Sequence, residues 1–176
     1  METVLEMPDP AFEPRQPNAV NKPAMLSHGT LQVRNLKESR RFYEEFLGLE
    51  CVRQGPRAIF VRCGIKFHIV AWEAGEKARG AYLHQHWGLE LRSKEEIDQA
   101  HARAKELKNE YKIGQIHDPE QHHGVYSFYF EDLDGNWWEF QHYDGCQHDD
   151  AFDFGDRFGQ ESAAEAPAEA AMKPAS

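Results

Sequence analysis

The sequence has few cysteines, no long apolar run and no excess of basic charge. The three cysteines among 176 residues form no CxxC pair, which argues against a disulfide framework or a thiolate zinc site and favours a reducing compartment. No apolar run approaches the ~20 residues that span a bilayer, and the first residues lack the pattern of a secretory signal. The 30 acidic residues outnumber the 20 basic ones, which argues against nucleic acid as a partner. We therefore expect a cytoplasmic protein with neither a membrane nor a nucleic-acid partner.

The acidic charge is concentrated at the two ends of the chain. Residues 1–24 hold four acids and two bases, residues 144–176 hold eight acids and two bases, and residues 25–143 hold 18 acids and 16 bases. We predict an N-terminal tail over 1–24, one folded domain over 25–143, and a C-terminal arm with an acidic Ala-rich tail over 144–176. Within the arm, Ala151–Phe158 carries three phenylalanines, and we expect it to lie on the domain or on a partner subunit.

The central part of the chain contains an internal repeat. His28 begins the segment HGTLQV and His86 begins HWGLEL, and both alternate as a strand does. Each is followed by a helical pattern and then by three strand patterns. We predict helices over 36–47 and 93–108, with Ser93 as an N-cap, and strands over 50–54, 58–62, 66–72, 112–116, 125–131 and 137–143. The pattern therefore predicts an α+β fold of two βαβββ modules, 25–75 and 80–143.

The repeat relates four side chains that can bind a metal. His28 corresponds to His86, and the last strands align so that His68 corresponds to Glu139. Imidazole and carboxylate groups are common ligands of transition metals, and a pseudo-twofold axis would bring the two pairs together. His84 competes with His86 because both face the same side, and the alignment of the repeat favours His86.

This arrangement resembles the vicinal oxygen chelate superfamily, which includes glyoxalase I, fosfomycin-resistance enzymes, bleomycin-binding proteins and type I extradiol ring-cleavage dioxygenases. The resemblance covers about residues 25–143. It implies two βαβββ modules whose strands form a cupped mixed sheet around a single metal site. It also implies that the metal ligands are His28, His86 and Glu139.

Within the superfamily, the segment HHGVYSFYFEDLDGNWWE is most similar to the extradiol dioxygenase signature. Phe128-Tyr129, Asp132, Gly135 and Glu139 fit the signature, and Leu133 stands where the family has proline. Both His122 and His123 are candidates for the signature histidine, and the spacing favours His122. The resemblance implies that His68 is the acid/base catalyst and that Tyr129, with His122 or His123, hydrogen-bonds the substrate oxygens.

Two histidines and one carboxylate leave three open positions on a six-coordinate metal, as in non-haem Fe(II) oxygenases. A catecholate can occupy two of these positions and O₂ the third. Aromatic side chains could wall a dry pocket for a flat substrate, and the substrate-binding candidates are Trp87, Tyr126 and Trp137. We expect an Fe(II)-dependent extradiol dioxygenase that acts on a catechol with O₂, with Mn(II) as a possible replacement for iron.

Other readings of the same residues stay open. A glyoxalase-like lyase, isomerase or hydrolase would use Ni, Zn or Mn, and His68 would then be a metal ligand or a base. A non-catalytic sequestering protein would not need the three ligands together. Because related folds commonly dimerise, we expect a homodimer, in which Asp144–Phe158 forms a lid or arm. His101, His117, His142 and His148 are predicted to be surface residues.

Overall fold

The computed structural model describes residue 20 and residues 26–64, 67–122 and 124–145. The predicted tails lie almost entirely outside these ranges, as does His123, so the domain boundaries stay predictions. Among the described residues, no helix is both long and apolar enough to cross a membrane.

The first module forms a four-stranded mixed sheet. Its elements are β1 (His28–Val33), α1 (Leu36–Arg41), a π-helical segment (Phe42–Phe46), β2 (Glu50–Gly55), β3 (Ala58–Arg62) and β4 (His68–Glu73). The strand order is β1-β4-β3-β2, in which β1 runs parallel to β4 and the other pairs are antiparallel. The side chain of Asn35 caps α1 by accepting from the backbone amides of Lys37 and Glu38.

The second module repeats this order. Its elements are β5 (Trp87–Glu90), α2 (Lys94–Glu106), β6 (Glu120–His122), β7 (Val125–Glu131) and β8 (Trp137–Tyr143), preceded by the short 3-10 helices Gly75–Lys77 and Leu83–Gln85. The sheet order is β5-β8-β7-β6, again with one parallel pair. Ser93 caps α2, as predicted, by accepting from the backbone amide of Glu96. The α+β fold of two βαβββ modules is therefore confirmed.

One predicted strand is wrong. The segment 112–116 forms only an isolated bridge between Ile116 and Phe130, and the edge strand is instead β6, at Glu120–His122. Lys112 has a φ of 54°, which lies in the left-handed region and cannot continue an extended strand. The β-branched residues Ile113 and Ile116 were therefore not sufficient to define a strand.

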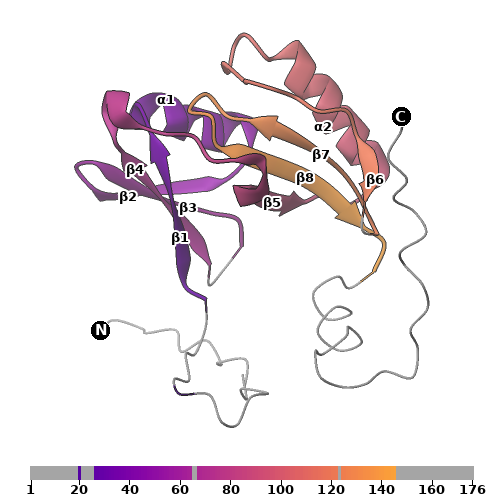
Figure 1. Ribbon diagram of the computed structural model, residues 1–176, viewed down its shortest axis with the longest axis horizontal. Helices are drawn as coiled ribbons and strands as arrows, with labels where there is room; N and C mark the ends of the chain where they lie inside the picture. The colour runs from indigo at the N-terminus through magenta and orange to yellow at the C-terminus, as the bar shows by residue number, and fades with distance from the viewer. Residues whose placement is uncertain (1–19, 21–25, 65–66, 123, 146–176) are drawn as a thin grey trace, which may run out of the picture.

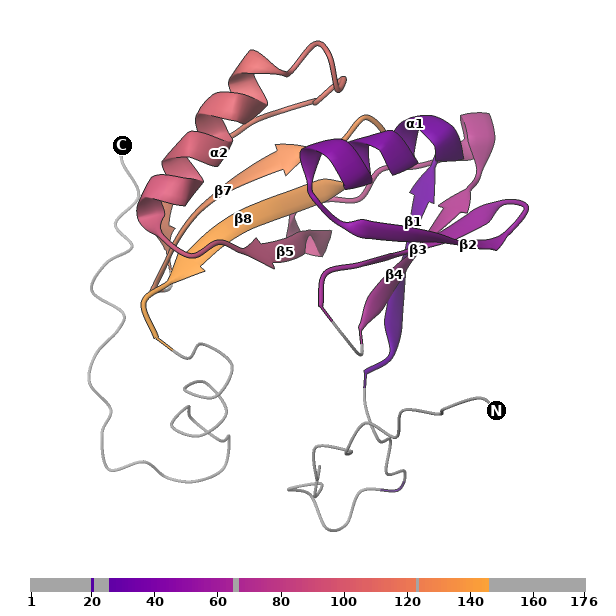
Figure 2. The same cartoon turned by 180° about the vertical axis from the view of Figure 1, so that it is seen from behind.

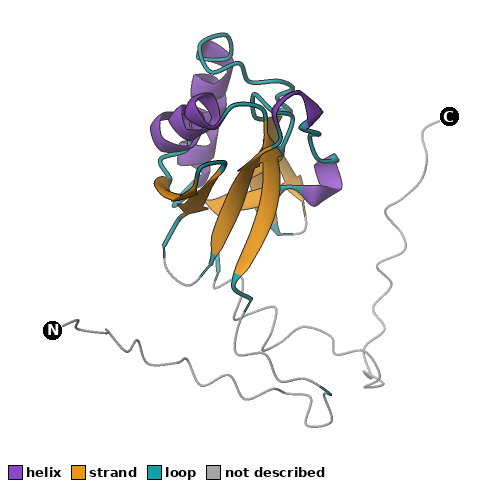
Figure 3. Cartoon of the chain, turned by 90° about the vertical axis from the view of Figure 1, so that its left-hand side faces the viewer, coloured by secondary structure: helices purple, strands orange, loops and turns teal. Residues whose placement is uncertain are grey.

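The two modules share one hydrophobic core. The two sheets lie at a steep angle to each other, α2 covers one face of β7 and β8, and α1 lies beside the same strands (Figures 1 and 2). In Figure 3 the larger group of helical turns lies to one side of the strands, and further helical turns lie on the other side. Tyr43 from the first module packs against Trp138 with ring centroids 5.6 Å apart, and Phe46 packs edge-on against Phe130 at 6.0 Å. The first helix therefore packs on the second sheet.

Polar contacts at the β7–β8 turn also join the modules. The buried carboxylate of Asp134 accepts from the Ser39 hydroxyl at 2.6 Å and from the Arg34 amide at 2.8 Å. The Asn136 side chain donates to the Gln32 carbonyl at 3.0 Å. Because these groups lie away from water, each bond satisfies a polar atom that would otherwise be costly to bury.

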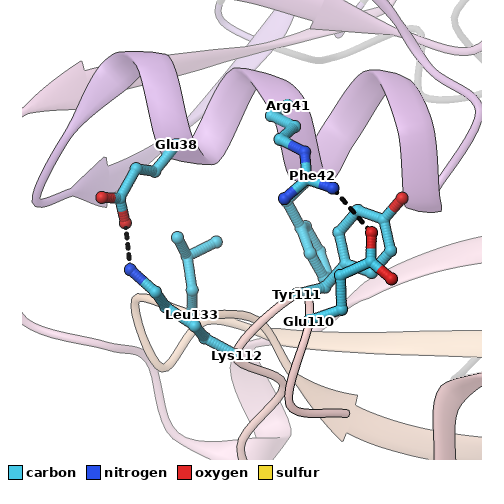
Figure 4. Close-up of a pocket in the computed structure, with 7 residues that line it drawn as sticks. All are labelled: Glu38, Arg41, Phe42, Glu110, Tyr111, Lys112 and Leu133. Carbon is cyan, nitrogen blue, oxygen red and sulfur yellow. Dashed lines mark hydrogen bonds and ion pairs between the residues drawn. The ribbon is translucent and has the colours of Figure 1, made fainter. Parts of the chain in front are cut away.

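A second set of contacts joins α1 to the segment after α2. Lys112 pairs with Glu38 at 2.6 Å, and Arg41 pairs with Glu110 at 2.8 Å (Figure 4). The two ion pairs stand on either side of a cavity of about 190 Å³. They are exposed, so we assign them a small share of the stability.

Candidate functional site

His86 and Glu139 form the closest pair among the predicted ligands. Nδ1 of His86 lies 2.7 Å from the carbonyl oxygen of Leu83. A carbonyl can only accept, so Nδ1 carries a proton, and in the neutral imidazole Nε2 then keeps its lone pair. That Nε2 atom lies 3.2 Å from Oε2 of Glu139. The contact involves His86 and not its competitor His84, which lies in the short helix Leu83–Gln85.

The Glu139 carboxylate is buried on β8, with only 5% of the residue exposed. Tyr129 is its partner across β7 and β8 and donates its hydroxyl proton to the carboxylate. Burial, and then this hydrogen bond, raise the pKa of Tyr129 to about 12. Among the described residues, no lysine or arginine forms an ion pair with Glu139, and the basic side chain that contacts it is His86. A buried carboxylate is costly unless a positive group lies beside it.

These features fit a divalent cation at the His86–Glu139 pair. Two donors that each lie ~2.1 Å from one ion are separated by about 3.0–3.4 Å, and Nε2 and Oε2 lie 3.2 Å apart. A histidine that binds a metal commonly donates its other N–H to a carbonyl or carboxylate, as His86 does to Leu83. The donor types are those of the predicted metal site.

His28 and His68 form the second predicted pair. They are direct partners across β1 and β4, and their rings stack with centroids 5.5 Å apart. Nδ1 of His28 lies 2.9 Å from the Ser27 hydroxyl. The ring of Phe60 meets His68 edge-on, with centroids 4.6 Å apart. The first sheet therefore holds its two histidines side by side.

The structure thus brings the four predicted residues together as two pairs and not as one group. His28 and His68 belong to the first sheet, whereas His86, directly before β5, and Glu139 on β8 belong to the second module. In the described part of the chain, no three His, Cys, Asp or Glu side chains are placed to hold one metal ion. A single chain in this conformation therefore supplies two metal donors at the His28–His68 pair and two at the His86–Glu139 pair.

Trp137 and His117 lie on the same face as Glu139. Trp137 precedes Glu139 by two residues on β8, so both side chains point to one side of the sheet. The ring of His117 lies 5.1 Å from that of Trp137 and 6.3 Å from that of Tyr129, centroid to centroid. His117, predicted to be a surface residue, is therefore a neighbour of the candidate site. Nothing in its local sequence indicated this place, because it depends on the long-range bridge between Ile116 and Phe130.

His122 lies on the same sheet face but farther along it. It pairs with Val125, and its Nε2 lies 2.7 Å from Glu120. Val125 precedes Tyr129 by four residues on β7, which corresponds to ~13 Å along a strand. The structure does not place His122 beside Tyr129, and His123 lies outside the described residues.

Tyr126 and Trp87 lie on the opposite face from Glu139. Tyr126 alternates with Tyr129 along β7, and its hydroxyl donates to Asp98 of α2 at 2.8 Å. Trp87 pairs with the core residue Trp138, whereas Gly88 pairs with Glu139. Neither aromatic ring therefore walls the His86–Glu139 pair, although Trp87 and His68 both line a cavity of about 110 Å³ between the modules.

Comparisons with known proteins agree with this architecture. Residues 25–140 match the model of the Glyoxalase/Bleomycin resistance protein/Dioxygenase superfamily. No curated protein sequence matches. A lactoylglutathione lyase from Agrobacterium tumefaciens is 22% identical with a TM-score of 0.52, over 69% of this chain and 96% of that one.

Two further solved structures show the same fold. The fosfomycin resistance protein FosX from Listeria monocytogenes is 23% identical with a TM-score of 0.53, over 67% of this chain and 92% of that one. A glyoxalase/bleomycin resistance protein/dioxygenase from Alicyclobacillus acidocaldarius is 24% identical with a TM-score of 0.52, over 76% and 97%. With the family match over residues 25–140, the chain belongs to the glyoxalase/bleomycin resistance protein/dioxygenase superfamily.

Proposed function

We propose that the chain is an Fe(II)-dependent extradiol dioxygenase that cleaves a catechol-type aromatic ring with O₂. The observation that carries the proposal is the His86–Glu139 pair, in which Nε2 of the imidazole and a buried carboxylate oxygen lie 3.2 Å apart. His28 is the third donor of the proposed set, which is then the two-histidine, one-carboxylate set of non-haem Fe(II) oxygenases. Mn(II) suits the same donors.

Each neighbouring side chain has a role in this proposal. When bound, the cation would hold both oxygens of the diol and lower the pKa of the hydroxyl groups. Tyr129 keeps its proton at neutral pH because its pKa is about 12, so it can donate a hydrogen bond to a substrate oxygen. His68 accepts the proton of the second hydroxyl and later returns it, and Trp137 offers a flat wall to the ring.

We propose further that the protein acts as a homodimer in which the site is shared. His28 and His68 lie in one module and His86 and Glu139 in the other, so a second copy could complete the donor set. A mixture of His28→Ala and Glu139→Gln proteins tests this sharing. Regained metal binding at one site per heterodimer supports a shared site, and no recovery at any mixing ratio contradicts it.

The reaction is tested by anaerobic reconstitution with Fe(II), followed by a panel of catechols and then O₂. We expect O₂ uptake together with a yellow ring-fission product. His86→Ala should abolish both, because it removes a proposed ligand. A protein that binds Fe(II) but consumes no O₂ with any catechol would rule out the dioxygenase reaction. Tight binding of a catechol without turnover would point to a sequestering protein.

A glyoxalase-like lyase, isomerase or hydrolase is the second candidate. It is favoured by the stacking of His68 on His28, because a side chain beside a ligand histidine can itself become a fourth ligand. His68→Ala separates the two candidates. In the dioxygenase the variant keeps its metal and loses most turnover, whereas in the lyase-type enzyme the variant loses its metal.

A further inference from the structure

An apolar groove separates the first helix from α2. Its volume is about 240 Å³, and its walls come from both modules. The apolar lining residues are Phe46, Leu47, Leu91, Ala100, Leu107 and Phe140. A groove of this kind, which runs between helices of two modules, can bind an extended apolar segment.

The rim of the groove carries one cation without an ion pair. Arg103 lines the groove, and its guanidinium pairs with no carboxylate of the described residues. The acid on the rim, Glu45, is already engaged by Arg41 at 2.8 Å and by the Tyr111 hydroxyl at 3.2 Å. The apolar lining suits aromatic side chains, and Arg103 suits an acidic group. The groove therefore suits a segment that carries both.

The described chain ends beside this groove. His142 donates from Nδ1 to the carbonyl oxygen of Leu91 at 3.0 Å, and Leu91 lines the groove. The next residues stay close, because Asp144 lies 2.8 Å from Nε2 of His142 and 3.5 Å from Nζ of Lys94. The C-terminal residues that follow Gly145 therefore start near the Leu91 side of the groove.

We propose that the segment Ala151–Phe158 of the same chain docks in this groove. The five residues 146–150 can span up to ~18 Å when extended, which suffices to bring the segment from the end of β8 to the groove. In an extended chain Phe152 and Phe154 point to one side and Asp153 to the other. Residues 146–158 contain four aspartates and one arginine, so their charge complements Arg103.

Docking of Ala151–Phe158 in the groove would hold the two modules together. The groove is lined by Phe46 and Leu47 of the first module and by Leu91, Leu107 and Phe140 of the second. A segment that fills it covers apolar surface from both modules at once. The docked segment would therefore strap the two modules together in the arrangement that positions the two pairs of candidate ligands.

The test is hydrogen exchange of the full chain, followed by mass spectrometry of peptides. We expect the amides of residues 152–158 to exchange at least about tenfold more slowly than those of residues 163–171 in the same molecule. Phe152→Ser with Phe154→Ser should abolish this difference. Arg103→Glu should reduce it, and Arg53→Glu, a matched charge change at an exposed position of β2, should leave it unchanged.

Three results would overturn the proposal. Equal exchange of residues 152–158 and 163–171 in the unaltered chain would show that the segment is not docked. Protection that survives both Arg103→Glu and Leu107→Ser would place it on another surface. Protection that grows with protein concentration would assign the groove to the segment of a second copy. Unchanged exchange of β3 in every variant confirms that the fold is intact.

Discussion

Gly29 on β1 lies directly against the indole of Trp87 on β5. A Cβ atom added to Gly29 would lie 2.0 Å from Cη2 of Trp87, so no other residue fits there without movement. The indole lies on the face of β5 that packs against the core, beside Trp138. The contact therefore sets how closely the first strands of the two modules approach each other.

The close approach at Gly29 predicts a cost for any side chain at that position. Gly29→Ala should lower the free energy of unfolding by about 1–3 kcal/mol, because the methyl group overpacks a rigid ring. Gly55→Ala is the matched control, since no heavy atom lies within 4 Å of its added Cβ. Urea unfolding of both variants measures the difference, and equal midpoints would contradict the prediction.

The hydrogen bond from Tyr129 to Glu139 predicts an effect on metal binding. Tyr129→Phe removes the donor that orients the carboxylate, and we expect the affinity for Fe(II) or Mn(II) to fall about tenfold. Tyr126→Phe should leave the affinity unchanged, because that hydroxyl donates to Asp98 on the other face of the sheet. Anaerobic competition titrations compare the two variants, and similar losses in both would exclude a specific role for Tyr129.

The contact of His86 with Glu139 predicts which histidine before β5 binds the metal. His86→Ala should abolish tight binding of one equivalent of metal, because its Nε2 is the nitrogen that faces the carboxylate. His84→Ala should retain binding, since His84 lies outside this contact. Metal content after dialysis is the measurement. Loss of metal in His84→Ala alone would reverse the assignment.

Asp132 predicts a dependence of stability on pH. Burial raises the pKa of Asp132 to about 6 from an ordinary value of 3.8. The folded state therefore holds a proton more tightly than the unfolded state, and this contribution is present below pH ~4 and lost as the pH rises through ~6. Asp132→Asn should remove that part of the slope in urea unfolding between pH 4 and 6.

Two further features make the Asp132 test specific. The variant should also lose about 1–3 kcal/mol at pH 7, because an amide cannot accept all the bonds from Tyr43, Asn136 and Trp138. Glu50→Gln is the control with the opposite sign, since the hydrogen bond from Arg62 lowers the pKa of Glu50. An unchanged slope in Asp132→Asn would contradict the assignment.

Local patterns were sufficient for most of the fold. The alternation after His28 and His86 predicted strands, and Ser93 predicted the start of α2, because both signals depend on neighbouring residues only. The edge strand of the second sheet was not predictable in this way. The segment 112–116 contains two isoleucines, which favour a strand, but Lys112 turns the chain with a φ of 54°. The edge strand that pairs with β7 is β6, farther along the chain.

The candidate site also combines features that the sequence predicted with features that only the tertiary structure shows. By itself the sequence determined the two modules and the types of donor, since a repeat and a period of two show which residues are equivalent and which share a face. Only the tertiary structure decided that Glu139 meets His86 and Tyr129 while His68 meets His28. It also brought His117 beside Trp137. These contacts join residues far apart in the chain, and they depend on strand register and on how the π-helical segment Phe42–Phe46 packs on the second sheet.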